Sequence, residues 1–79
     1  MRPDTEFTIN IKKARIKEND AEIERLNEMI KNLEIRKGKE SKPTAKKNIE
    51  QDIAAKIEMR DRLVEQNRID AQIVLSLMK

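Results

Sequence analysis

The residues with the clearest capacity for chemistry are six bases packed into twelve positions, RKGKESKPTAKK, from Arg36 to Lys47. This stretch, called the basic turn below, carries one acid, Glu40, and the only glycine of the chain. Its bases could neutralise several phosphates, which would give strongly salt-dependent binding without sequence preference. The six positions are Arg36, Lys37, Lys39, Lys42, Lys46 and Lys47.

Specific nucleic-acid readout is not indicated by this turn. Phe7 is the only aromatic residue that could stack on a base, and lysine outnumbers the arginine that base edges favour. A turn of this kind can simply be solubilising. However, Lys46 and Lys47 fall in the first turn of the predicted second helix, where the helix dipole disfavours cations. Residues that go against such a local helix preference are typical of functional positions. Binding of an anionic partner, either nucleic acid or an acidic protein, is therefore the second hypothesis for this chain.

Catalytic chemistry is disfavoured. The chain has no histidine, no cysteine and no glycine-rich loop, so a general base, a thiol nucleophile and a phosphate-binding loop are all missing. Carboxylates at helical spacing, such as Glu18 and Glu22, have bases nearby and indicate a solvated face. We therefore expect no enzyme activity, no cofactor, no metal and no small-molecule substrate.

Length and composition predict a single domain, 1–79, whose own core is too small to make it stable without a further interaction. Charged residues make up 42% of the 79 residues, and the net charge is +3. Small domains bury a low fraction of their surface, and without cysteine or histidine the remedy is self-association or docking on a partner. No apolar run is long enough for a membrane span and the N-terminal residues lack a signal-peptide core, so we predict a cytoplasmic protein.

Two heptad patterns give the fold. Isoleucine recurs at 9, 16, 23 and 30, with Lys12, Asn19, Leu26 and Leu33 at the companion positions, which predicts a helix over about 10–37 capped by Gly38. Residues 5–11 alternate in polarity and fit a strand as well as a helix. After a turn at 38–43, a second helix is predicted over about 44–78. Its repeat is Ile57, Val64, Ala71 and Met78, with Ile53, Arg60, Asn67 and Val74.

The prediction is an all-α fold, an antiparallel two-helix hairpin of coiled-coil type that assembles into a dimeric or higher helical bundle. The two repeats mesh when Ile30 faces Ile53 and Asn19 faces Val64. A short turn favours this arrangement over one continuous helix paired with a second chain.

Three polar residues interrupt the predicted seam: Asn19, Arg60 and Asn67. The two amides lie close enough to hydrogen-bond and would set the register, a known use of buried asparagine. A polar ligand pocket is the alternative. Arg60 is expected to reach an acid such as Glu22 or Asp20, or else to bind an anion inside an oligomer.

A surplus of apolar residues gathers at the open end of the hairpin and predicts a protein interface. Self-association is favoured, and docking on another protein, in part by strand addition of the N-terminal segment, is the alternative. Membrane insertion is disfavoured because the run is short and lacks interfacial aromatics. The predicted interface comprises Phe7, Ile9, Ile11, Val74, Leu75, Leu77 and Met78.

These observations predict a non-enzymatic macromolecule-binding module that acts by steric occupation or scaffolding. No motif is specific to a family. In general type, a short helical hairpin without histidine or cysteine, the chain resembles small accessory proteins of phages and mobile elements. That resemblance implies an inhibitor, adaptor or assembly factor.

Overall fold

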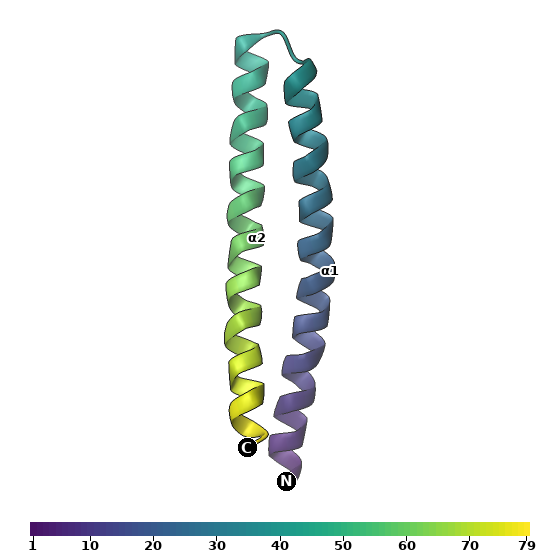
Figure 1. Cartoon of the computed structure of the whole chain (residues 1–79), viewed down its shortest axis with the longest axis vertical. Coiled ribbons are helices and arrows are strands. Elements are labelled where there is room, and N and C mark those ends of the chain that lie inside the picture. Colours follow the sequence, from purple (N-terminus) through teal and green to yellow (C-terminus); the bar gives the residue numbers. More distant parts are fainter.

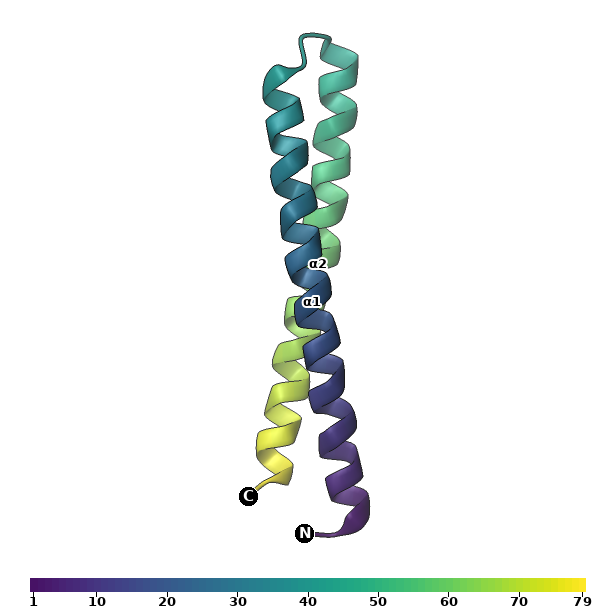
Figure 2. The same ribbon diagram turned by 90° about the vertical axis from the view of Figure 1, so that its right-hand side faces the viewer.

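The computed structural model describes all residues, 1–79, as two antiparallel helices, α1 (Pro3–Lys39) and α2 (Pro43–Leu77). The molecule is a rod of 60 × 14 × 14 Å with both termini at one end (Figure 1). Turned by 90°, the helices cross near the middle of the rod (Figure 2), as expected for a coiled pair. The all-α hairpin is therefore confirmed. Neither helix has an apolar stretch long enough to cross a membrane.

The N-terminal segment is helical, so a strand over residues 5–11 is excluded and the helix begins seven residues before the predicted residue 10. Pro3 occupies the first turn, where its fixed φ fits and its missing N–H costs nothing. Asp4 and Glu6 add negative charge at the positive end of the helix dipole. The alternation of apolar residues leaves Ile9 in the seam while Phe7 and Ile11 remain exposed.

The connection is shorter than predicted. Helix α1 continues through Gly38 to Lys39, and no residue has a positive φ, so Gly38 is not the predicted helix cap. Only residues 40–42 separate the helices. The carboxylate of Glu40 accepts hydrogen bonds from the N–H groups of Ser41 (3.1 Å) and Lys42 (3.0 Å), which fixes the bend before Pro43 begins α2. A side-chain contact thus replaces the glycine conformation that the sequence suggested.

Gly38→Ala is expected to stabilise the hairpin by about 0.4–1 kcal/mol, because alanine restricts the unfolded chain and favours the helix. Gly38 has helical backbone, and a methyl group there would meet no atom within 4 Å. Urea unfolding followed by circular dichroism measures the change. A destabilised Gly38→Ala variant would contradict the helical assignment of this residue.

The apolar core lies in the half of the rod next to the turn. Ile30, Leu33, Ile49 and Ile53 form one buried cluster, with Ile57 packed against it. Leu26 extends this core toward the middle and is 1% exposed. The first-helix seam agrees with the predicted heptads, because its isoleucine and companion positions are all buried or half-buried.

The α2 seam differs from the predicted one. Val64 and Met78, which were assigned to it, are exposed, and Leu63, Asp70 and Leu77 take their places. The hydrogen bond between Asn19 and Asn67 shifts the pairing by three residues, since Asn19 was expected opposite Val64. The observed seam has Leu63 in place of Val64 and Leu77 in place of Met78, both half-buried, and it puts Asp70 in place of Ala71, against bases of α1.

The exposed faces carry ion pairs within each helix that respond to acid. A hydrogen bond from Arg25 lowers the pKa of Glu22, and one from Arg68 lowers the pKa of Glu65. A carboxyl group whose pKa is lower in the folded state than in the unfolded state stabilises the fold at pH values above the unfolded-state pKa. This contribution is lost as the pH falls through the folded-state pKa.

Helix stability is therefore expected to decrease as the pH falls through the lowered pKa values of the two carboxylates and they become protonated. Denaturation midpoints at pH 6 and at pH 2.5 measure this effect. The Glu22→Gln/Glu65→Gln variant should show a weaker dependence on pH over that interval. An identical dependence in wild type and variant would contradict the assignment to these two pairs.

Candidate functional site

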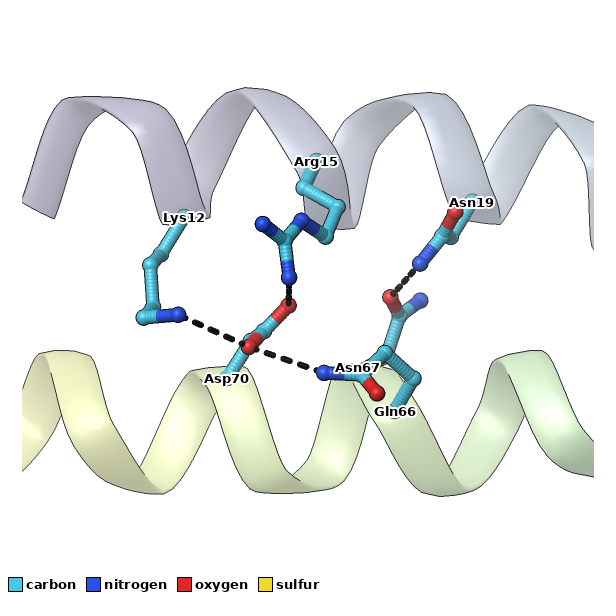
Figure 3. A network of polar contacts seen from close by, with 6 residues as sticks. All are labelled: Lys12, Arg15, Asn19, Gln66, Asn67 and Asp70. Carbon is cyan, nitrogen blue, oxygen red and sulfur yellow. Dashed lines mark hydrogen bonds and ion pairs between the residues drawn. The ribbon is translucent and has the colours of Figure 1, made fainter. Parts of the chain in front are cut away.

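A polar network lies between the helices in the half of the rod near the open end, and Figure 3 shows its six residues. Asp70 is its centre and is completely buried. Lys12 Nζ lies 3.4 Å from Asp70 Oδ1, Arg15 lies 3.7 Å from Asp70 Oδ2, and Gln66 Nε2 donates to Oδ1 at 3.1 Å. Asp70 Oδ2 has no hydrogen-bond donor. The carboxylate is therefore held by two cations at long range and by one amide.

The predicted contact between the two amides is present. Asn19 Nδ2 donates to Asn67 Oδ1 at 3.0 Å, and Asn67 Nδ2 donates to Asp20 Oδ1 at 2.8 Å (Figure 3 draws the first). Both the oxygen and the nitrogen of the Asn67 side-chain amide are thus engaged by α1. A shift of either helix by one heptad would break both hydrogen bonds and separate Asp70 from its bases, so the network favours a single register.

The position of Arg60 differs from the prediction. Its guanidinium donates to Asn27 Oδ1 at 3.0 Å and pairs with Asp61 at 3.2 Å, whereas Glu22 is held by Arg25. Arg60 is half-buried at the edge of the seam, where its stem covers apolar surface and its head reaches polar groups. The three-residue shift in pairing explains why the expected acids are not its partners.

The network has the composition of a structural layer and not of a ligand pocket. Two shallow grooves occur on the molecule, about 660 and 290 Å³ in volume, and Asp70 lines neither. No cluster of three acidic side chains is placed to hold a metal. Asp70 was not among the residues singled out from the sequence. Its seven-residue spacing from Leu63 and Leu77 is the signal that could have identified it.

The residues of the predicted protein interface do not form one patch. Ile9 and Val74 are buried inside the hairpin, so their assignment to an outward interface is wrong, and Leu77 is half-buried in the seam. Phe7 and Ile11 each lie two residues from Ile9, about 200° around the helix, and therefore point away from α2. The exposed members on α2 are Leu75 and Met78. The open end thus has separate apolar surfaces on its two helices.

The basic turn remains largely free of internal partners. Lys37 pairs with Glu50 at 3.3 Å, which ties the end of α1 to the beginning of α2. No ion pair involves the other five bases, and the first turn of α2 contains no acidic residue. The five are Arg36, Lys39, Lys42, Lys46 and Lys47.

Comparisons with known proteins give no relative from which a function could be transferred: no protein-family model, no curated protein and no solved structure matches the chain.

Proposed function

We propose that this chain is a non-enzymatic macromolecule-binding module, a cytoplasmic adaptor or inhibitor that works by steric occupation or scaffolding. The observation that carries the proposal is the distribution of apolar side chains. Nine large apolar residues are exposed, whereas the core contains seven. A monomeric soluble protein rarely leaves so much apolar surface without a partner.

Three of these nine residues, Phe7, Ile11 and Ile35, lie on the exposed side of α1. Phe7, Ala14, Ala21 and Ile35 are spaced at multiples of seven residues and are all exposed, which aligns them along the side opposite the seam, with Glu28 at the one charged position of this repeat. Phe7 is 66% exposed and stands next to exposed Ile11, one turn along the same helix. This α1 outer stripe supplies an apolar anchor near the open end, and a stripe with this spacing suits a helix or a groove on another protein.

Affinity capture with a matched pair of variants tests the proposal. Wild type, Phe7→Ser/Ile11→Ser and the control Ile69→Ser would be immobilised and exposed to lysate of the source organism. We expect a partner that wild type and control retain and that the α1 variant loses, and a purified partner should then bind with the same order of affinities. Equal retention by all three proteins, or no retained macromolecule, would contradict the proposal.

Nucleic-acid binding through the basic turn is the second candidate. It is favoured by the five bases without ion pairs and by Lys46 and Lys47 in a helical turn without acids. Labelled single- and double-stranded DNA would be titrated against wild type and Lys42→Glu/Lys46→Glu/Lys47→Glu. Binding that weakens by about 10³-fold or more between roughly 50 and 200 mM salt, and is lost in the variant, would support a phosphate grip of about six contacts. Binding that survives the charge reversal would eliminate this candidate.

A further inference from the structure

A row of apolar residues follows α2 beside the seam and is only partly covered by α1, since Ile57 and Ala71 are half-buried and the other members are exposed. Four of them, spaced by seven, each follow a seam residue by four positions and therefore lie about 40° around the helix from the seam. Ala54 and Leu75 each follow a seam residue by one position and lie further out, at about 100°. These six residues, the α2 flank, are Ala54, Ile57, Val64, Ala71, Leu75 and Met78.

The side of α1 next to the α2 flank is polar. The α1 residues at the corresponding positions, four after each seam isoleucine, are Lys13, Asp20, Asn27 and Glu34. They offer no apolar surface to the flank, and Asp20 and Asn27 are occupied by Asn67 and Arg60. As a result Val64 is 49% exposed and Leu75 is 63% exposed. The flank is thus an unpartnered apolar surface with the seven-residue spacing that packs against a helix.

We propose that a second copy of this chain covers the α2 flank, with α2 packed antiparallel on α2 about a two-fold axis near residue 66. The inference deepens the proposed function, on which it rests, by naming one partner and the surface that binds it. An axis at this point superposes the stretch 54–78 on the same stretch of the second copy. Ala54 and Ile57 then meet Met78 and Leu75 of the second copy, whereas Val64 and Ala71 meet its Arg68 and Asp61.

The two-fold arrangement is complementary in shape and charge. It places Leu75 opposite Ile57 of the second copy, and Met78 opposite Ala54, so that large residues alternate with small or branched ones. Arg68 lies opposite Val64 of the second copy. Asp61 of the second copy lies one helical turn from that Val64, so the positive charge of Arg68 and the negative charge of Asp61 come close together. The two-fold axis repeats this contact. A parallel arrangement would bring Arg68 against Arg68 and Asp61 against Asp61, which is unfavourable.

The exposed area of the hairpin agrees with the need for such a partner. The accessible surface is 6124 Å², whereas a compact monomer of 9.3 kDa is expected to have about 5,000 Å². The excess of about 1,100 Å² is spread over the whole 60 Å rod, and it is enough to supply the roughly 800 Å² that each partner buries in a standard protein interface.

Val64→Arg and Ile35→Arg form a matched pair for testing the surface. Both residues are 49% exposed, but Val64 lies on the α2 flank and Ile35 lies on the outer face of α1. In sedimentation equilibrium, Val64→Arg should raise the dimer dissociation constant roughly 100-fold or more, because symmetry twice places the added positive charge opposite Arg68 of the other copy. Ile35→Arg should leave it within about two-fold. Circular dichroism of both variants checks that the helices are retained.

Met78→Asp provides a second probe, because this residue is exposed near the end of α2 and its replacement does not disturb the core. It too should weaken the dimer. A dissociation constant unchanged in both Val64→Arg and Met78→Asp would overturn the inference. So would a loss of the dimer in Ile35→Arg equal to that in Val64→Arg, or a wild-type protein that stays monomeric at about 100 µM.

The orientation can be tested with thiols because the chain has no cysteine. Antiparallel packing places residue 64 opposite residue 68, so an equimolar mixture of Val64→Cys and Arg68→Cys should form a disulfide-linked dimer. Each variant alone should link poorly, since identical positions lie further apart than the about 7 Å between Cα atoms that a disulfide allows. Efficient linking of Val64→Cys with itself would indicate parallel packing and contradict the proposed axis.

The two proposals fail separately. A monomeric wild type that still captures a macromolecule through Phe7 and Ile11 would remove the second copy as partner and leave the binding module intact. A dimer that is insensitive to Val64→Arg but lost in Phe7→Ser/Ile11→Ser would move self-association to α1. A protein that neither self-associates nor captures a macromolecule would contradict both proposals.

Discussion

Leu26→Ala is expected to lower the free energy of unfolding by about 2–5 kcal/mol, the range for removing a buried leucine side chain. Leu26 is 1% exposed, and only seven hydrophobic residues are buried in the whole chain. It lies between the apolar cluster next to the turn and the polar network, so few neighbours can move in to fill the space. For a domain with about 0.05–0.15 kcal/mol of stability per residue, this loss is a large part of the total.

Urea denaturation followed by circular dichroism measures this change, at one fixed protein concentration because self-association adds to apparent stability. Ile35→Ala is the control, since it removes an aliphatic side chain from the exposed face of the same helix. Its effect should stay within about 0.5 kcal/mol. Equal effects in the two variants would mean that Leu26 is not part of the core and that the α1 seam is misassigned.

Asp70→Leu is expected to stabilise the hairpin, by about 1–4 kcal/mol, despite the loss of two ion pairs. Asp70 is completely buried, its Oδ2 has no hydrogen bond, and its cations lie at 3.4 and 3.7 Å. These contacts compensate poorly for removing a carboxylate from water. Leucine would continue the seam of Leu63 and Leu77, while the side chains of Lys12 and Arg15 are partly exposed and can turn to water.

Asp70→Asn is the informative comparison, because it keeps the shape but removes the charge. Both variants remove the counter-charge of Lys12 and Arg15, but only asparagine buries an amide N–H that points toward these cations and finds no acceptor, so we expect a loss of about 1–3 kcal/mol. The two variants should therefore shift the urea midpoint in opposite directions. A destabilised Asp70→Leu would show that the network contributes net stability, and its proposed role in selecting the register would lose its main support.

Much of the fold could be predicted because the α1 pattern is unambiguous. Isoleucines at 9, 16, 23 and 30 leave one possible seam, and all four are buried or half-buried in the hairpin. Helix α2 offers two overlapping heptads, one through Val64 and one through Leu63, and periodicity alone does not choose between them. The choice depends on contacts across the pair, in which Asn67 and Asp70 find partners on α1.

The same ambiguity explains which parts of the candidate surfaces were misplaced. Assigning Val64 and Met78 to the seam concealed the α2 flank, and grouping Ile9 with Phe7 overlooked that residues two apart lie on opposite sides of a helix. The beginning of α1 was uncertain because three alternating apolar residues satisfy a strand until a partner helix is present. Gly38 indicated a cap, but the carboxylate of Glu40 fixes the bend three residues before Pro43.

The α1 outer stripe and the α2 flank face different directions, so a dimer formed through α2 would leave Phe7 and Ile11 of both copies accessible. Such a dimer would present two copies of the same apolar anchor. This arrangement fits an adaptor or a steric inhibitor, and bivalent engagement would raise the apparent affinity for a partner with repeated sites.

The mass in solution tests the central claim, that the apolar faces of this hairpin are association surfaces. Light scattering would be recorded over a dilution series at about 50 and 500 mM salt, because salt screens charge contacts but hardly weakens apolar burial. We expect about 18.6 kDa, twice the 9.3 kDa of one chain, at both salt concentrations until dilution dissociates the dimer. A mass of 9.3 kDa throughout would contradict self-association, and a dimer that forms only at low salt would show that charge, not the apolar flank, holds the copies together.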